Sequence, residues 1–281
     1  MLRRLNLATE WDELTILGGS RAGEGTLLLL PQLSLALDIG RAHRSLTPMS
    51  TVCISHGHAD HLGGLAYWAS QRLLNSMAPG TLLVPGNIGD EVADLLRLHA
   101  RLEGGKAYAV NLVPVGHGTR HHFRRDMNLE FFTTDHWVPT LGSRLVWTRR
   151  RLLPELRNSP SEDLAARRRR GQEITYEVAS PLLAYGADTG PGIFAQAETL
   201  AAEVVLLECS FWNDDDLDRA RRFSHLHLSD IVNAAPQLTC RHLVLLHLSR
   251  RNRIKDVEKI MAAELEPLFD GRLHHLIVDW E

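Results

Sequence analysis

The feature that most constrains how this chain can fold is a histidine-rich run, SHGHADHLGG, at residues 55–64. It follows an apolar stretch that predicts a strand, and it precedes a segment with helical spacing. Residues two apart in an extended segment point the same way, so His56 and His58 can reach one ion, while Asp60 and His61 can reach a second. Imidazole and carboxylate ligands suit zinc and similar divalent metals, and a set without thiolates leaves coordination open for a reactive water. The run therefore predicts a metal site where a strand meets a helix.

Apolar periodicity along the rest of the chain predicts short strands that alternate with helices, which indicates a layered α/β architecture. No repeat and no linker-like segment is visible, so we expect a single domain over residues 1–281, with a polar, arginine-rich surface arm near 149–172. Strands are expected at 14–17, 26–30, 33–38, 51–55, 81–84, 109–115, 129–133, 144–148, 182–185, 204–207, 243–246 and 276–278, and helices at 64–76, 89–102, 191–201, 229–235 and 254–269.

Composition narrows the class of protein. The chain has 281 residues, of which 44% are hydrophobic and 23% charged, and this is typical of a globular protein. Three widely spaced cysteines argue against a disulfide framework, and no apolar run is long enough to cross a bilayer, so we expect a cytoplasmic protein without a membrane partner. The net charge of -3 excludes an overall basic protein, but arginine clusters leave room for a locally basic face.

The histidine run resembles the signature of the metallo-β-lactamase superfamily. The resemblance implies an αββα sandwich, in which helices cover two central sheets, and a site for two divalent metal ions. It also implies that Asp38, at a strand end, supports the metal histidines through hydrogen bonds. Three later residues are similar to the remaining ligands of the family: His136, Asp188 as the bridging aspartate, and His247.

Within this superfamily the chain is most similar to the ribonuclease Z family. Segments that carry this resemblance include the residues after His136, the segment that begins at Glu208, and the segments that begin at His227 and at His247. The resemblance implies that Glu208 orients His227, which then protonates the leaving oxygen. His225 lies two residues away and could point the same way; we prefer His227 because its Leu-Ser continuation and the following helix match better.

We therefore predict a metal-dependent hydrolase resembling ribonuclease Z, which cuts precursor tRNA at its 3′ end by means of a metal-activated water. One metal would be held by His56, His58 and His136 and the other by Asp60, His61 and His247, with Asp188 between them and with Asp60, Glu208 and His227 as catalytic residues. Zinc is the expected metal, although manganese or iron would suit the same ligands. RNA is the expected partner, and the family resemblance implies a homodimer.

Two other functions remain open at this stage. The first is another hydrolase of the same fold, which acts on a small phosphodiester, a lactone or a thioester. The second is a non-catalytic RNA-binding or regulatory protein that retains the metal cage. The run 167–170 could hold RNA phosphates through paired N–H donors, or it could be a solvated helix face.

Overall fold

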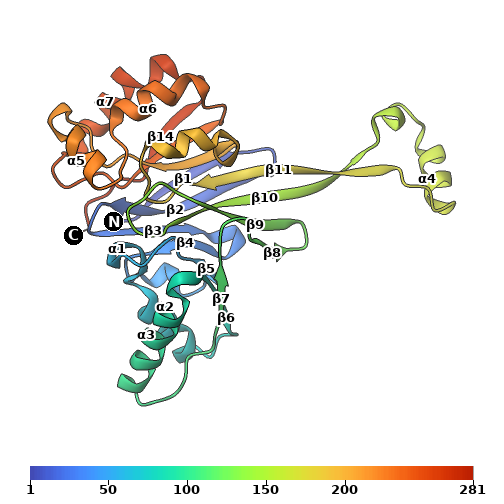
Figure 1. Cartoon of the computed structure of the whole chain (residues 1–281). Coiled ribbons are helices and arrows are strands. Elements are labelled where there is room, and N and C mark those ends of the chain that lie inside the picture. Colours follow the sequence, from blue (N-terminus) through green and yellow to red (C-terminus); the bar gives the residue numbers. More distant parts are fainter. Residues whose placement is uncertain (281) are drawn as a thin grey trace.

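The chain is arranged in four layers in the computed structural model, which describes residues 1–280 (Figure 1). Within these residues it forms two seven-stranded sheets. In spatial order the first sheet contains β1 (Arg3–Ala8), β2 (Glu13–Arg21), β3 (Gly25–Leu30), β4 (Leu35–Ile39), β5 (Thr51–Cys53), β6 (Gly80–Pro85) and β7 (Val110–Val115). The second contains β14 (Arg272–His275), β13 (His242–Leu246), β12 (Val204–Glu208), β11 (Thr175–Tyr185), β10 (Leu141–Leu152), β9 (Met127–Thr133) and β8 (Arg120–Arg124).

The helices are α1 (Ala59–Leu62), α2 (Leu65–Leu74), α3 (Gly89–Leu102), α4 (Ser161–Arg169), α5 (Leu217–Arg222), α6 (Leu228–Ala234) and α7 (Val257–Glu264). Apart from α4, which lies at the end of a projecting hairpin, they lie beside the sandwich of the two sheets (Figure 1). Figure 1 shows α2 and α3 on one side of the sheets and α5, α6 and α7 on the other. The predicted αββα sandwich is therefore confirmed. Among residues 1–280, no helix has both the length and the apolar character needed to cross a membrane.

Strand alternation explains how the layers hold together, and β3 shows it clearly. Leu28 and Leu30 are buried in the core between the two sheets, whereas Leu27 and Leu29 are buried on the opposite face with Trp68 of α2. Because successive strand residues point to opposite faces, one apolar strand can serve two cores. A third core lies between the second sheet and α6 and α7. Burial on both faces is why the central strands read as continuous apolar runs.

The directions of the strands bring several loops to one edge of the sandwich. Strands β4, β5 and β6 are parallel to one another, as are β11, β12 and β13. Loops that follow parallel strands emerge at the same edge of a sheet, which is where open α/β sheets place their ligands. The segments after β5, β11, β12 and β13 all carry residues that the sequence nominates as site residues, and Asp38 lies near the end of β4.

An arm extends away from the sandwich. Strands β10 and β11 are longer than expected and pair as far as Leu152 and Thr175. Figure 1 shows this hairpin projecting far from the body, with α4 at its tip. No residue of α4 is buried. The outer part of these strands lacks apolar alternation because it packs against no second layer, and this explains why sequence periodicity did not reveal it.

Candidate metal centre

Three overlapping groups of potential metal ligands meet at the edge where these loops emerge, and two of them contain the seven ligands that the sequence nominates; the third consists of Asp188, Glu208, His225 and His247. In the first group, ligand atoms of His56, His58, His136 and Asp188 all lie within 4.8 Å of one another. His56 and His58 come from the loop after β5, His136 from the loop after β9, and Asp188 from the loop after β11. His56 is fully buried and His58 is partly exposed. Residues from both sheets therefore build one cage.

The second group consists of Asp60, His61 and His247, whose ligand atoms also lie within 4.8 Å of one another. Asp188 lies between the two groups: its carboxylate is 3.8 Å from Nε2 of His56, 3.3 Å from Nε2 of His61 and 3.5 Å from Nε2 of His247. All seven residues that the sequence nominates as ligands thus come together, with Asp188 at the centre.

Backbone geometry helps to aim these side chains. Asp38, Ala187 and His247 adopt positive φ angles of 54°, 52° and 60° although none is glycine. Such conformations are uncommon for residues with a Cβ atom, and they persist where the surrounding structure holds them. Each lies at or just after the end of a strand, at the edge that carries the ligands. The turn after the strand is therefore tight enough to direct the next side chain into the site.

Hydrogen bonds to Asp38 fix the orientation of two ligands. The buried Asp38 carboxylate accepts bonds from Nδ1 of His61 (2.8 Å), Oγ of Ser55 (2.7 Å), the Ser55 N–H (2.7 Å) and the Tyr185 hydroxyl (2.6 Å). Ser55 Oγ in turn accepts from Nδ1 of His56 at 2.9 Å. Since the Nδ1 atoms of His56 and His61 are engaged in these bonds, the Nε2 atoms of both rings face the site. The predicted supporting role of Asp38 fits this geometry.

The second sheet holds His247 in the same manner. Ser210 Oγ donates to Oε2 of Glu208 at 2.7 Å and accepts from Nδ1 of His247 at 3.0 Å. A carboxylate, a serine and a histidine therefore form equivalent relays on the two sheets. Each directs an Nε2 atom toward other candidate ligands: Nε2 of His56 lies 2.8 Å from Nδ1 of His58, and Nε2 of His247 lies 3.4 Å from Oδ2 of Asp60. Such supporting bonds raise the basicity of a ligating imidazole and fix its ring plane.

His136 provides a direct test of whether the site fits a metal ion. Its Nδ1 donates to the carbonyl of Ser224 at 3.1 Å, whereas its buried Nε2 has no hydrogen-bond partner within the described residues. Burial lowers the pKa of His136, and burial together with the nearby His61 lowers the pKa of His56 to about 2. These imidazoles are therefore neutral, the form that binds metals. An unsatisfied lone pair among further nitrogen and oxygen ligands fits a divalent cation.

The two acidic ligands are ionised. Burial alone would raise the pKa of Asp60, but its contacts with His247 and His61 outweigh burial and hold the pKa well below its usual range. Burial likewise opposes ionisation of Asp188, and the nearby His247 and His61 again lower its pKa. In return, Asp188 and Asp38 raise the pKa of His61 well above its usual value against the effect of burial. The centre thus concentrates negative charge where a cation would lie.

The structure corrects one sequence prediction. Glu208 was expected to orient His227, but Oε1 of Glu208 bonds Nδ1 of His225 at 2.5 Å instead. His227 occupies the N-cap of α6, where its Nδ1 accepts from the Ser229 N–H and its Nε2 lies 3.0 Å from the carbonyl oxygen of Asn213. Both ring nitrogens of His227 are therefore occupied by contacts at the start of α6. The Glu208–His227 pair is therefore wrong, and His225 takes its place.

His225 has the properties expected of a proton donor. Burial opposes its protonation, but the adjacent Glu208 outweighs burial and raises the pKa of His225 to about 9. Its ring centroid lies 5.0 Å from that of His136 and 5.3 Å from that of His247. An imidazolium held by a carboxylate therefore lies beside both ligand groups. In the sequence, His225 is the alternative to His227, two residues away.

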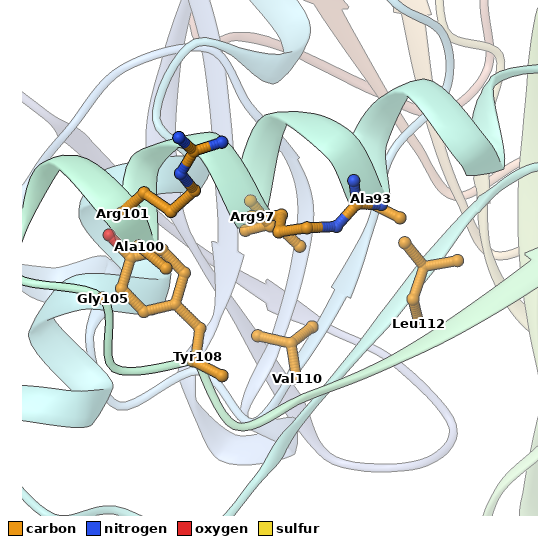
Figure 2. Close-up of a pocket in the computed structure, with 10 residues that line it drawn as sticks. Ala93, Arg97, Ala100, Arg101, Gly105, Tyr108, Val110 and Leu112 are labelled. Atoms are coloured by element: carbon orange, nitrogen blue, oxygen red, sulfur yellow. The ribbon is translucent and has the colours of Figure 1, made fainter.

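A separate cavity of about 270 Å³ lies between α3 and β7 and is not part of this centre. Figure 2 shows Tyr108 and Val110 opposite the helix residues Arg97 and Arg101. Its lining is mainly apolar and contains neither histidine, cysteine nor carboxylate, so the cavity lacks the side chains that usually bind metal ions. The lining residues are Ala93, Leu96, Arg97, Ala100, Arg101, Gly105, Ala107, Tyr108, Val110 and Leu112.

Comparison with known proteins agrees with the fold and the site. A family model described as "Beta-lactamase superfamily domain" matches residues 28–248. The chain therefore belongs to the beta-lactamase superfamily, and it is a metal-dependent hydrolase.

More specific relatives share most of their length with this chain. The tRNase Z TRZ1 of Arabidopsis thaliana is 31% identical over 263 residues, which cover 92% of this chain and 93% of that protein. The chloroplastic tRNase Z TRZ2 of the same organism is 27% identical over 273 residues, 93% of this chain and 77% of that protein. Within the superfamily, the chain belongs to the tRNase Z family.

Solved structures show the same fold. The short form of human tRNase Z matches with a TM-score of 0.55 and 15% identity, over 83% of this chain and 92% of that chain. The metallo-β-lactamase fold protein YhfI from Bacillus subtilis matches with a TM-score of 0.58 and 15% identity, over 93% and 95%. At this identity the likeness concerns the arrangement of sheets and helices.

Proposed function

We propose that this chain is an endoribonuclease that removes the 3′ trailer of precursor tRNA and leaves a 3′-hydroxyl on the tRNA. The observation that carries the proposal is that Asp188 lies within 4 Å of histidines from both ligand groups, beside the Glu208–His225 pair. Relatives named tRNase Z over most of the chain support the substrate.

We assign two zinc ions to the centre. His56, His58 and His136 would hold one, and Asp60, His61 and His247 the other, with Asp188 contributing to both. When bound, a pair of divalent ions acidifies a water molecule and neutralises charge on the attacked phosphate. The free Nε2 of His136 and the engaged Nδ1 atoms of the other ligands support this assignment.

Asp60 has the position and charge needed to orient the attacking water. Its Oδ2 atom accepts a bond from the Gly23 N–H at 2.7 Å and lies 3.4 Å from Nε2 of His247. Because its pKa lies below the usual range, Asp60 stays ionised and accepts a hydrogen bond from the water. The hairpin tip at Gly23 thereby fixes the carboxylate from outside the metal centre.

His225 would complete the reaction on the leaving side. As the bond between phosphorus and O3′ breaks, Nε2–H of His225 gives its proton to the departing O3′. Glu208 binds Nδ1 and stabilises the protonated ring before the transfer, and three further bonds, from Thr189 N–H, Ser210 N–H and Ser210 Oγ, hold Glu208 in place. The pair therefore supplies orientation together with a proton.

The arm supplies a surface for RNA. Arg167–Arg170 are exposed at and just after the end of α4, and within the described residues they form no ion pair. By contrast, Arg149 and Arg151 at the base of the arm are both bound to Glu10. Unpaired guanidinium groups on a projecting hairpin can bind phosphates of an RNA whose cleavage site lies at the metal centre.

A cytoplasmic homodimer completes the proposal. The family resemblance supports the dimer, and three buried free cysteines, Cys53, Cys209 and Cys240, suit a reducing compartment. Light scattering of the purified chain tests the dimer: a mass near 31.5 kDa rather than twice that value would contradict it.

The decisive experiment uses a 3′-extended tRNA transcript and the metal-loaded protein, with the cut mapped at nucleotide resolution. A single cut at the base of the trailer that leaves a 3′-hydroxyl supports the proposal. Asp60→Ala should remove cleavage while the protein stays folded. Tight RNA binding without cleavage under zinc, manganese and iron would indicate a non-catalytic RNA-binding protein, and turnover restricted to lactones or small phosphodiesters would indicate a different hydrolase.

A further inference from the structure

Trp137 is an exposed aromatic side chain at the rim of the metal centre. It follows His136 directly, and 64% of its surface is exposed. Its ring centroid lies 5.5 Å from that of His58, with a tilt of 39° between the planes, and 6.4 Å from that of His136. We propose that Trp137 is a stacking platform for an unpaired RNA base next to the scissile phosphate, an inference that rests on the function proposed above.

The other tryptophans show what this residue lacks. Four of them donate their indole N–H to a protein acceptor, whereas Trp137 has no hydrogen-bond partner within the described residues. Three of the four are also covered by an arginine guanidinium. Trp137 therefore has neither a polar partner nor a covering group, and it makes its ring contacts only with two proposed metal ligands. The four bonded tryptophans are Trp68, Trp147, Trp212 and Trp280.

Phe223, which precedes Ser224, is another exposed aromatic residue, but its ring is not equally free. The Ser224 carbonyl that follows it accepts from Nδ1 of His136, so Phe223 is also close to the centre. Its ring is 38% exposed, but the guanidinium groups of Arg219 and Arg222 each lie 5.6 Å from the ring centroid. Both cations compete with a base for the ring, and this leaves Trp137 as the available platform.

The loop that carries Trp137 is held firmly before any substrate binds. Thr134 Oγ1 donates to the carbonyl of Asp188 at 2.9 Å, and the Asp135 carboxylate accepts from the Gly192 N–H at 3.0 Å. The far end of the loop is closed by a bond from the Thr134 N–H to the Thr140 carbonyl at 3.1 Å. A platform that is already ordered loses little conformational entropy when it binds its ligand.

An unpaired base suits this position for chemical reasons. The 3′ end of a precursor tRNA is single-stranded, so its bases can leave the stack, and every base has a face that can lie on an indole ring. Such contacts tolerate any sequence because they involve no base edges. Trp137 is therefore a positioning residue: it fixes the nucleotide whose phosphate lies at the centre and does not read its identity.

The test compares wild type, Trp137→Ala and Trp137→Phe on a 3′-extended tRNA and on copies with one abasic nucleotide at successive positions around the cut. On intact RNA, Trp137→Ala should lower kcat/KM by about 5-fold to 100-fold, mainly through KM, since stacking on one aromatic side chain contributes that much to RNA affinity. Trp137→Phe should retain most of the rate. At one abasic position, wild type should fall to the level of Trp137→Ala, and the two proteins should then be equal.

Several results would overturn the inference. Equal rates for wild type and Trp137→Ala on intact RNA would do so, as would a Trp137→Ala defect that persists on every abasic RNA, because the residue would then act through the metal ligands. Leu98→Ala, which removes another exposed hydrophobic side chain on the distant α3, is the matched control and should cut like wild type. Failure of wild type to cut intact RNA would instead refute the proposed function itself.

Discussion

Replacement of Asp38 by asparagine tests the hydrogen-bond network behind the metal centre. Asp38 accepts four hydrogen bonds, one at Oδ1 and three at Oδ2. Asparagine keeps one acceptor oxygen and puts an NH₂ group where the other was. If the NH₂ replaces Oδ1 it meets the fixed Ser55 N–H, and if it replaces Oδ2 it meets the Nδ1–H of His61. Either orientation therefore leaves buried donors facing each other.

The magnitude follows from the number and type of bonds lost. A hydrogen bond to a charged group contributes about 1.5–3 kcal/mol, and an unsatisfied buried donor costs about 1–3 kcal/mol. Asp38→Asn should therefore lower the free energy of unfolding by about 3–5 kcal/mol. Tyr185→Phe removes one of the four donors and leaves the carboxylate intact, so it should cost about 1–2 kcal/mol. Metal affinity should fall about 10-fold to 100-fold for Asp38→Asn, because His61 and His56 lose their fixed orientation.

Urea unfolding of the metal-free proteins measures the first effect, and titration with zinc against a competing chelator measures the second. The matched variant Tyr185→Phe separates loss of one bond from loss of the charged acceptor. If Asp38→Asn unfolds within 0.5 kcal/mol of wild type, as surface substitutions usually do, and also binds zinc equally well, the network does not support the ligands and the reasoning fails.

Further predictions concern the proton donor, the arm and the stability of the fold. His225→Ala should lower kcat by about 10²-fold to 10⁴-fold because the leaving oxygen loses its proton donor. His227→Ala should leave kcat close to wild type and lower the free energy of unfolding by about 1 kcal/mol, because α6 loses its N-cap. The opposite pattern of rates in single-turnover cleavage would support the pairing of Glu208 with His227. Replacement of Arg167–Arg170 by alanine should raise KM for precursor tRNA and flatten its salt dependence without changing the melting temperature; an unchanged salt slope would exclude the arm from RNA binding. Burial and the neighbouring His242 lower the pKa of His274 to about 4, so the folded state resists protonation and stability should fall by at most about 3 kcal/mol as the pH drops from about 6.5 to about 4. His274→Gln should weaken that pH dependence in urea unfolding, and an identical slope would contradict the assignment.

Much of the fold could be predicted from sequence because burial leaves a clear pattern. The helix 89–102 was predicted with the bounds that α3 has, since its apolar residues repeat with helical spacing. The outer halves of β10 and β11 were not predicted because no second layer packs against them. Their pairing depends on the hydrogen-bond ladder and on ion pairs such as that of Arg150 with Glu177, and neither has a signature in apolar periodicity.

The residues of the site also fall into those that the sequence predicted and those that it did not. Ligand types and spacing nominated all seven residues that come together, but the choice between His225 and His227 depended on which ring reaches Glu208. The sequence did contain a signal: His227 is followed two and three residues later by Ser229 and Asp230, which resembles a helix cap, and the structure has both halves of that capping box. The family resemblance implied that Asp38 supports the histidines, but nothing in the sequence identified its partner Tyr185, which lies 147 positions away.

The origin of the ligands in two different layers has a consequence for assembly. The first sheet and its loops carry His56, His58, Asp60 and His61, and the second carries His136, Asp188 and His247. Each ion would therefore be bound by residues of both sheets and would link them. Neither half of the chain can retain an ion with its full set of ligands unless the other half is docked. Loss of either cation would weaken the contact between the two sheets. The chain must therefore fold completely before it can bind the metals and become active.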